Sequence, residues 1–296
     1  MRLHFYKLHI GGNSFVLIDD IKNIKPNEFE KISISICSRR FGIGASGCIF
    51  FDEQNNLRIY NHRGEKENDA CDALICAARF AFDSGKINRD DKGNKKIIFN
   101  TNHGEKTLDI ISSREFKLNL GTPFSFISGN ILSSDKCDCM DTFLIDDKPI
   151  CVSAIHLIEN NIVILNPEQS NYSFFEFYLK MQKSFQRKKI YLTFARSITK
   201  ETISVRTLHH GLSTVCTSSA CALISSFYAN RTNKDAVCIF EHGKPNLWTQ
   251  QNKLREDKDN SRKLSVFWDT KINEVIVIGT GGYLFEGFFD YEEINA

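Results

Sequence analysis

Two cysteine pairs with the same spacing are the residues of this sequence best suited to chemistry. Cys71 and Cys76 lie in the run DACDALICAARF, and Cys216 and Cys221 lie in VCTSSACALI. Each run is largely apolar, which predicts a buried helix whose first cysteine lies at or near its start. Unpaired backbone N–H groups and the positive end of the helix dipole favour a thiolate there. Two such thiols that face each other would form a proton-transfer pair, which is our first hypothesis. The alternative is that both helices are core and that cysteine serves as a small hydrophobic residue.

The spacing of the cysteines does not favour a metal site. Four residues between two cysteines place the sulfurs on different sides of a helix, and no tight Cys/His box completes either pair. We therefore expect no metal at these cysteines.

The composition limits which binding partners and which cellular compartment we expect for this protein. The 296 residues suggest two domains or one large one, and 38 basic residues nearly balance 36 acidic ones. This balance gives no reason to expect nucleic acid or a membrane as a partner. We see no signal peptide or spanning helix in the sequence, and most of the ten cysteines lie in or beside apolar runs. We therefore expect a reduced, cytoplasmic protein.

Strands are predicted on both sides of each cysteine helix. In the first half they span 3–7, 14–19, 32–36, 48–52, 57–61, 96–101, 107–112 and 116–120, with a short helix at 26–31. In the second half they span 149–155, 161–165, 189–195, 202–208, 236–241, 264–269, 274–278 and 283–289, with a helix at 168–185 and a charged loop at 250–262. Many strands and one buried helix in each half predict two similar α+β domains, each a sheet wrapped round its helix. A doubly wound fold would need regular alternation of strands and helices.

Four segments resemble the diaminopimelate epimerases, a family of amino-acid racemases that work without pyridoxal phosphate. They are FYKLHIGGNSFVLID at 5–19, RRFGIGASG at 39–47, RIYNHRG at 58–64 and GTGGYLFEG at 279–287. The resemblance covers nearly the whole chain. It implies two similar domains, each a barrel-like sheet round a central helix, with no cofactor and a place in lysine biosynthesis. The implied domains are 1–118, to which 281–296 return, and 119–280. A homodimer is left open.

The resemblance also implies the site residues. The two catalytic thiols would be Cys71 and Cys216, one taking the α-proton of an amino acid and the other returning a proton. Without a gap, Ala70 falls on the first catalytic position, whereas one inserted residue brings Cys71 there; both alternatives stay open. The residues expected to bind substrate are Asn13, Asn61, Asp72, Ala73, Thr217 and Ser218.

The sequence departs from the family where substrate should bind. The glycines of both family helix starts are replaced by larger residues, and the family's Glu-Arg pair is replaced by Thr207 and Leu208. Asp72 beside Cys71 would disfavour a thiolate by like-charge repulsion and would repel a substrate carboxylate. Two hypotheses follow: an active amino-acid racemase, or an inactive relative that binds a ligand or a partner chain. A third is a hydrolase or transferase that pairs Cys216 with His209 or His210.

Overall fold

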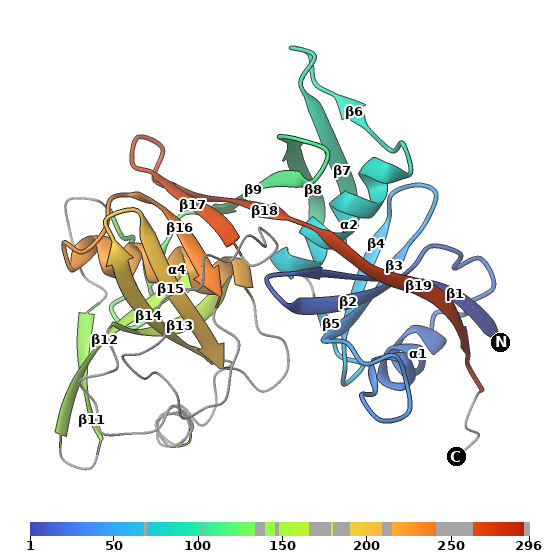
Figure 1. Cartoon of the computed structure of the whole chain (residues 1–296), viewed down its shortest axis with the longest axis horizontal. Coiled ribbons are helices and arrows are strands. Elements are labelled where there is room, and N and C mark those ends of the chain that lie inside the picture. The colour runs from blue at the N-terminus through green and yellow to red at the C-terminus, as the bar shows by residue number, and fades with distance from the viewer. Residues whose placement is uncertain are drawn as a thin grey trace. The chain divides into compact units, whose positions relative to one another are not determined.

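The computed structural model describes residues 1–67, 70–101, 103–133, 140–145, 148–165, 179, 190–208, 215–240 and 263–292 (Figure 1). The described residues of Met1–Leu118 and Gly279–Ala296 form one compact unit, and those of Asn119–His209 and Val215–Ile278 form a second. The helix predicted over 168–185 and the loop predicted over 250–262 lie, apart from Leu179, outside the described residues. No helix in the described part of the chain is long and apolar enough to cross a membrane.

The first unit is built on a six-stranded sheet that both ends of the chain enter. Its strands are β1 (Arg2–Ile10), β2 (Asn13–Ile18), β3 (Gly47–Phe51), β4 (Leu57–Asn61), β5 (Lys66–Glu67) and β19 (Gly282–Asp290). Their order is β19-β1-β2-β3-β4-β5, so the first strand of the chain lies between the second and the last. Only β2 and β3 run parallel, and the other neighbours are antiparallel.

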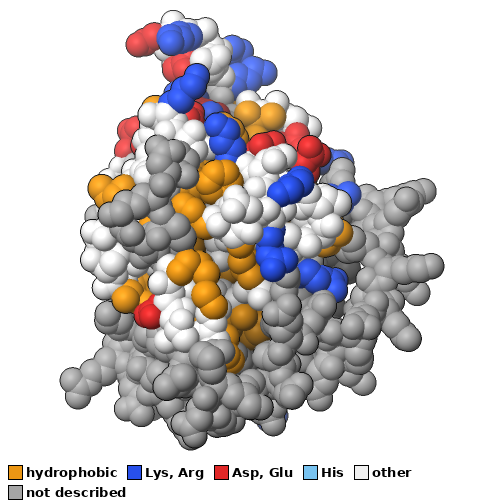
Figure 2. Space-filling view, turned by 90° about the vertical axis from the view of Figure 1, so that its left-hand side faces the viewer, with side chains coloured by type: hydrophobic (Ala, Val, Ile, Leu, Met, Phe, Trp, Pro, Cys, Tyr) orange, Lys and Arg blue, Asp and Glu red, His pale blue; other side chains and the backbone are white. Residues whose placement is uncertain are grey.

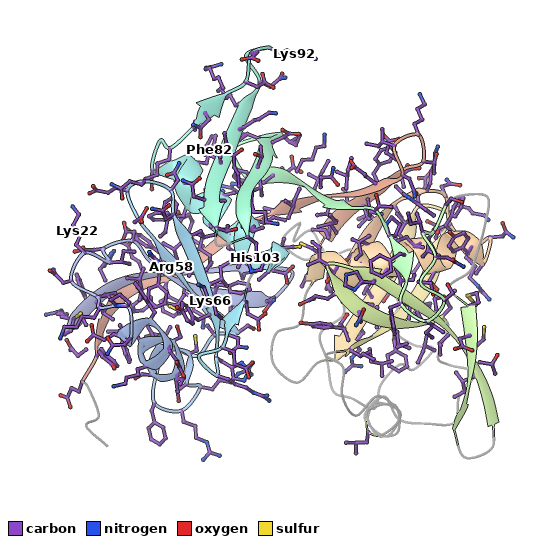
Figure 3. All side chains as sticks on the ribbon, turned by 180° about the vertical axis from the view of Figure 1, so that it is seen from behind. Lys22, Arg58, Lys66, Phe82, Lys92 and His103 are labelled. Atoms are coloured by element: carbon purple, nitrogen blue, oxygen red, sulfur yellow. The ribbon has the colours of Figure 1, made fainter. Side chains whose placement is uncertain are left out.

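A second group of strands extends the first unit. It consists of β6 (Asn88–Arg89), β7 (Lys95–Thr101), β8 (Gly104–Ile110) and β9 (Glu115–Gly121), each antiparallel to the next along the chain. The β6–β7 turn is closed by Asp90, whose Oδ1 accepts the N–H groups of Lys92 and Asn94. Lys92 therefore marks the tip of this hairpin, well away from β4 and Arg58 (Figure 3).

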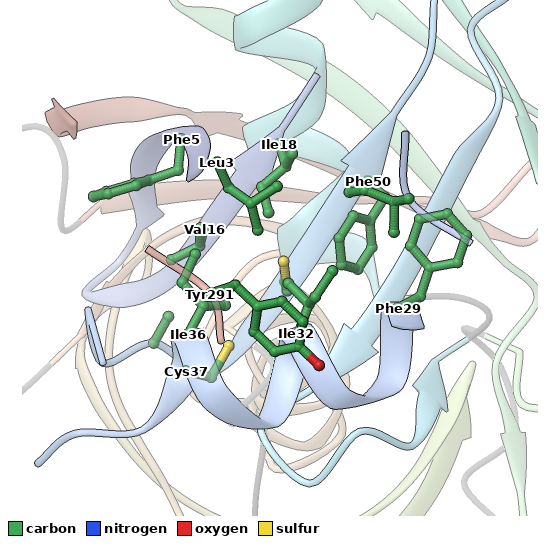
Figure 4. Close-up of a cluster of buried hydrophobic side chains, with 13 residues drawn as sticks. Leu3, Phe5, Val16, Ile18, Phe29, Ile32, Ile36, Cys37, Phe50 and Tyr291 are labelled. Atoms are coloured by element: carbon green, nitrogen blue, oxygen red, sulfur yellow. The ribbon is translucent and has the colours of Figure 1, made fainter. Parts of the chain in front are cut away.

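Helix α1 (Glu28–Cys37) covers one face of the six-stranded sheet and corrects the prediction for 32–36. The alternation Ile-Ser-Ile-Ser-Ile predicted a strand there, but the segment is helical. Ile32 and Ile36, four residues apart, are buried with Phe29 against Phe50 and its neighbours, while Ile34 is 45% exposed (Figure 4). The buried Ser33 donates its hydroxyl to the carbonyl of Phe29, so the helix satisfies the polar residue that the strand pattern would have placed on a surface.

Helix α2 (Cys71–Asp83) contacts β1, β2, β3 and β7. Every residue from Cys71 to Ala78 is buried, as the apolar run predicted. The chain that enters β19 passes very close to this helix at Gly281. A Cβ there would lie 2.8 Å from the Cβ of Arg79 and 3.0 Å from the carbonyl oxygen of Ile75. Only glycine permits this approach, which fixes the last strand against the helix.

The second unit surrounds one helix with strands. Its elements are β10 (Phe124–Ser125), β11 (Met140–Ile145), β12 (Lys148–Leu157), β13 (Glu159–Leu165), β14 (Ile190–Thr199), β15 (Thr202–Leu208), α4 (Val215–Tyr228), β16 (Asp235–Phe240), β17 (Lys263–Asp269) and β18 (Glu274–Thr280). The order is β10-β12-β13-β14-β15-β16-β17-β18, with β11 paired to β12. Helix α4 contacts each strand from β12 to β17, and its residues from Val215 to Ser226 are buried.

The described residues therefore lie mostly in strands and form three helices. Two of these helices are buried, α2 in the first unit and α4 in the second. The described strand orders do not close on themselves, so the predicted barrel-like sheets are not confirmed. Large hydrophobic side chains also reach the surface, and Figure 2 shows one face on which they are exposed. In the second unit the exposed ones include Ile127, Ile131, Met140, Phe267 and Ile272.

Candidate active site

The first turn of α2 begins at one of the two candidate catalytic cysteines. Cys71 is the first helical residue and is buried, while Ala70 is the N-cap, has an extended backbone and makes no side-chain capping bond. Ala73, two residues further on, is also buried. The structure thus places Cys71 among the N–H groups of the helix start, where the dipole favours a negative charge.

Asp72 follows Cys71 and is fully buried. Its Oδ2 accepts a hydrogen bond of 2.8 Å from the side-chain amide of Asn13, the first residue of β2. A carboxylate in the first turn is stabilised by the helix dipole and by a charge-assisted hydrogen bond. The structure therefore brings two of the predicted substrate-binding residues together, and they bind each other. The position where a substrate anion would gain most from the helix start is next to a carboxylate of the protein.

Asn61, another predicted substrate-binding residue, lies at the end of β4 and organises the turn that follows. Its amide group donates to Glu65 Oε2 and to Glu67 Oε1, both at 2.8 Å. Its side-chain oxygen, Oδ1, accepts hydrogen bonds from the backbone N–H groups of Arg63 at 2.9 Å and Glu65 at 3.0 Å. Both amide hydrogens and both acceptor positions are thus engaged within the turn. The predicted contact of Asn61 with a substrate stays a prediction.

The second cysteine of α2 has the character of a core residue. Burial raises the pKa of the Cys76 thiol well above its usual range, and the nearby charge of Asp72 raises it further. A thiol in this environment stays protonated at neutral pH and is a poor base or nucleophile. Cys76 is thus fully buried within α2, as a residue of the hydrophobic core would be.

The start of α4 differs in chemistry from the start of α2. Cys216 is the second helical residue, and Thr217 and Ser218 follow it; all three are fully buried. Thr217 Oγ1 donates to Glu159 Oε2 at 3.4 Å, and Ser218 Oγ donates to Asn161 Oδ1 at 3.4 Å. The two hydroxyl groups that were expected to bind substrate thus bind strand β13.

These partners belong to a polar strip on the sheet face under α4, made of Glu159, Asn161, Tyr191, Thr193 and Thr207. Tyr191 donates its hydroxyl to Glu159 Oε1 at 2.7 Å, and Thr193 donates to Asn161 Oδ1 at 3.2 Å. Thr193 also lies 3.3 Å from the hydroxyl of Thr207. The strip is continuous because Asn161 is in register with Tyr191, and Thr193 with Thr207.

The polar strip was not predicted from the sequence. The available signal was the alternation of Tyr191 and Thr193 with apolar neighbours, whereas residues 159–161 are consecutive polar residues that show no such alternation. The hydrolase hypothesis needs His209 or His210, and both lie outside the described residues. In the part of the chain that the structure describes, no group of three His, Cys, Asp or Glu side chains is arranged to hold a metal ion.

Comparison with known proteins supports the predicted resemblance. No protein-family model matches the chain. A diaminopimelate epimerase of Pelotomaculum thermopropionicum is 30% identical over 93 residues, which cover 30% of this chain and 33% of that protein. One of Caldanaerobacter subterraneus subsp. tengcongensis is 24% identical over 261 residues, which cover 81% of this chain and 90% of that protein. The first of these relatives is thus matched over only about a third of its length.

Among solved structures, the chain is similar to a hydroxyproline epimerase from Agrobacterium vitis with bound trans-4-OH-L-proline. The TM-score is 0.64 at 9% sequence identity, and the match covers 97% of this chain and 92% of that one. The chain therefore shares the fold of this epimerase. Its sequence relatives are diaminopimelate epimerases, so the resemblance predicted from the four sequence segments is confirmed.

Proposed function

We propose that this protein is a cofactor-independent amino-acid epimerase or racemase that uses Cys71 and Cys216. The observation that supports this most is their matched position: each is buried in the first turn of a buried helix. The proposal includes two domains, 1–118 with 281–296 and 119–280, each with a barrel-like sheet round its helix. Such a surrounding would hold each helix start, and the sulfur on it, in a fixed orientation.

The proposed reaction needs an acid and a base on opposite faces of the α-carbon. One cysteine, as the thiolate, takes the α-proton and becomes a thiol. The other, as the thiol, gives its proton to the opposite face and becomes a thiolate. The carbon is inverted, the protein keeps the same number of protons, and the roles of the sulfurs are exchanged. Backbone N–H groups at the helix starts stabilise the negative charge that develops on the substrate.

The second candidate function is a non-catalytic relative that binds a ligand or a partner chain. The observation in its favour is the buried Asp72 with its hydrogen bond to Asn13. This carboxylate adds negative charge beside Cys71, which opposes both a thiolate and a substrate carboxylate. The hydrogen bonds of the Asn61 side chain also favour the non-catalytic relative, because a group used in a turn is less available to a substrate.

Solvent deuterium incorporation at the α-carbon separates the two candidates. The reduced protein is incubated in heavy water with diaminopimelate and a panel of L- and D-amino acids, and exchange is followed by mass spectrometry. We expect exchange with at least one amino acid and a loss of about a hundredfold or more in Cys71→Ser and in Cys216→Ser. Cys151→Ser, at an exposed cysteine, is the matched control and should leave exchange unchanged.

Two results would change the proposal. Exchange that persists in Cys71→Ser but is lost in Cys216→Ser would exclude Cys71 from the proton-transfer pair, as expected if Ala70 occupies the first catalytic position and no thiol stands there. A folded protein that exchanges none of the amino acids would support the non-catalytic relative.

A further inference from the structure

The six-stranded sheet of the first unit has two very different edge strands. At one edge, β5 consists of only two residues, Lys66 and Glu67, and both are charged. At the other edge, β19 has nine residues and, in the described part of the chain, pairs only with β1. Natural sheets protect their edges with short strands, charged residues, proline or bulges, because an open edge offers unpaired backbone groups to another strand. The edge at β5 is protected in this way.

The edge at β19 has little of this protection from Phe285 to Asp290. The register shift between β1 and β19 lies between Lys7 and Leu8, and the pairing is regular from Lys7 with Phe285 to Arg2 with Asp290. The sequence of this segment, FEGFFD, contains neither proline nor lysine. The segment follows β1 along its length (Figure 1) and is extended, so its outer edge can accept a further strand.

Hydrophobic side chains of β19 are exposed along this edge. Leu284 is 50% exposed, Phe285 49% and Phe288 59%. Cations of β1 lie over the two rings: the guanidinium of Arg2 is 4.5 Å from the centroid of Phe288, and the ammonium of Lys7 is 5.4 Å from that of Phe285. These contacts orient the rings without removing them from water. Exposed hydrophobic side chains gathered on an open edge strand mark a site of strand pairing.

The exposed rings lie on both faces of the sheet. The ring centroid of Phe285 is 6.0 Å from that of Phe5, and the centroid of Phe288 is 5.0 Å from that of His4. Because His4 and Phe5 are consecutive residues of β1, their side chains point to opposite faces. A strand added at this edge would therefore cover hydrophobic surface on both faces at once.

We propose that the open edge of β19 pairs with β19 of a second copy of this chain, antiparallel and about a twofold axis. The six-stranded sheets of the two copies then form one continuous sheet. A twofold axis perpendicular to the sheet keeps each face on its own side. A residue therefore lies opposite its own copy or opposite a residue an even number of positions away. A second copy fits this edge because the segment is complementary to itself in one such register.

Two registers pair the largest part of the regular segment, one centred on Gly287 and the other on Phe288. The register centred on Phe288 brings Glu286 opposite the partner's Asp290, and like charges directly opposite each other destabilise a sheet. The register centred on Gly287 brings Glu286 opposite the partner's Phe288 and avoids this repulsion. The charges of the segment therefore favour the register centred on Gly287.

The register centred on Gly287 also matches aromatic residues. It places Phe285 of each copy opposite the partner's Phe289, a residue that is half-buried against the core of the first unit. Aromatic pairs across neighbouring strands stabilise a sheet. Gly287 itself lies on the axis, where the absence of a side chain lets the two backbones approach. A Cβ at this position would lie 3.4 Å from Phe5 of its own chain, an ordinary van der Waals contact, so a small side chain is tolerated there.

Sedimentation velocity of the whole chain tests the dimer. At micromolar concentration we expect twice the mass of one chain. Phe285→Glu and Phe288→Glu should each raise the dissociation constant by about tenfold or more, because each places a charge in a surface that the dimer buries. Phe288→Lys should weaken the dimer less than Phe288→Glu, since its charge is opposite to that of Glu286 across the axis. Phe41→Glu is the matched control, at an 88% exposed aromatic residue of the same unit outside β19, and should not change the mass.

Oxidative cross-linking of Gly287→Cys tests the register. Residues directly opposite each other in an antiparallel pair have Cα atoms about 4.5–5.5 Å apart, which a disulfide can span. Copper phenanthroline in air should therefore link two copies of this variant, with oxygen accepting the electrons of the two thiols. The matched control is Asp290→Cys on the same strand, whose thiols would lie about 20 Å apart and should not link. The wild-type chain, treated alike, gives the background from its native cysteines.

The outcomes do not depend on catalysis, so they separate this inference from the proposed function. A wild-type chain that remains monomeric at every concentration would overturn the dimer. A dimer that persists in folded Phe285→Glu and Phe288→Glu, or that Phe41→Glu disrupts equally, would show that β19 is not its interface. Equal cross-linking of Gly287→Cys and Asp290→Cys would rule out the register. Circular dichroism checks the fold of each variant, and if one is unfolded, the wild-type mass and the cross-link still decide.

Discussion

The starts of α2 and α4 have the same architecture but carry different polar groups beside the cysteine. Each is the first turn of a buried helix and contains a buried cysteine. In α2 the neighbour of that cysteine is a carboxylate, Asp72, which an amide group holds. In α4 the neighbours are the hydroxyl groups of Thr217 and Ser218, which bind the polar strip. The charge lies in the helix itself in the first case and on the facing strand in the second.

This difference shows that a helix start does not determine a site by itself. In α2 the protein supplies its own anion to the positive end of the helix, so a ligand anion would meet a repelling charge. In α4 the first turn presents neutral hydroxyl groups and leaves the negative charge on Glu159, across the interface with the sheet. We therefore expect loss of the polar side chain that follows the cysteine to lower stability more in α2 than in α4.

The largest expected effect on stability is at Asp72. Asp72→Ala removes a buried charge-assisted hydrogen bond and leaves the amide of Asn13 without this partner. We expect the free energy of unfolding to fall by about 3 kcal/mol, measured by urea denaturation. Glu53→Ala, which removes an exposed pair with Lys22, is the control and should leave the urea midpoint unchanged. If both variants unfold at the same urea concentration, α2 does not depend on its internal carboxylate.

The next effect is a pH dependence that comes from a buried thiol beside α4. Burial raises the pKa of Cys238 to about 12 from its usual 9.0, and its thiol donates to the backbone carbonyl of Ser219 at 3.7 Å. Below pH 9 the thiol is protonated in both folded and unfolded chains, so it adds no pH dependence. Between pH 9 and 12 only the unfolded chain loses this proton, so stability falls as pH rises, by about 1.4 kcal/mol per pH unit.

A Cys238→Ala variant isolates that contribution. Its free energy of unfolding, followed from pH 8 to pH 11, should decline less steeply above pH 9 than that of the wild-type protein. Any cavity left by the substitution lowers stability equally at every pH, so the slope is the informative quantity. Parallel curves for the two proteins would mean that Cys238 ionises as readily in the folded chain as in the unfolded one. Cys76 next to Asp72 should behave similarly, because burial and a nearby charge both raise its pKa.

The smallest expected effect on stability is at Thr217. Thr217→Val keeps the shape of the side chain and removes a hydrogen bond that is long, at 3.4 Å, to a half-buried carboxylate. We expect a loss of only about 0.5 kcal/mol by urea denaturation, since Glu159 keeps Tyr191 as a donor. Ser218→Ala, one residue further on, is the comparison at a fully buried acceptor, Asn161. A loss at Thr217 as large as that at Asp72 would remove the contrast between the two helix starts.

Local patterns predicted some elements well and failed where two patterns coincide. The helices at Cys71 and Cys216 were predictable because long apolar runs admit few alternatives. The run from Ile32 to Ile36 was not, because its strand-like alternation also places Ile32 and Ile36 on one side of a helix. The segment is helical because α1 packs these residues with Phe29, and because the hydroxyl of Ser33 donates to the backbone carbonyl of Phe29.

The candidate site shows a different limit. The cysteines could be predicted because their spacing is visible in the sequence. Glu159 and Tyr191 could not, because their contact depends on the register that pairs Asn161 with Tyr191. The role of Asn61 in the turn was missed for a related reason, since its partners Glu65 and Glu67 reach it only once β4 and β5 pair.

The position of β1 between β2 and β19 has a consequence for how the protein is made. The backbone N–H of Tyr291 donates to the carbonyl of Met1, and the amino terminus donates to the carbonyl of Tyr291. During synthesis, β1 and its neighbour β2 are translated long before β19, so the other edge of β1 stays open until β19 has been translated. The second unit, encoded between them, can fold during that interval. The sheet of the first unit is thus begun before the second unit is translated and completed after it.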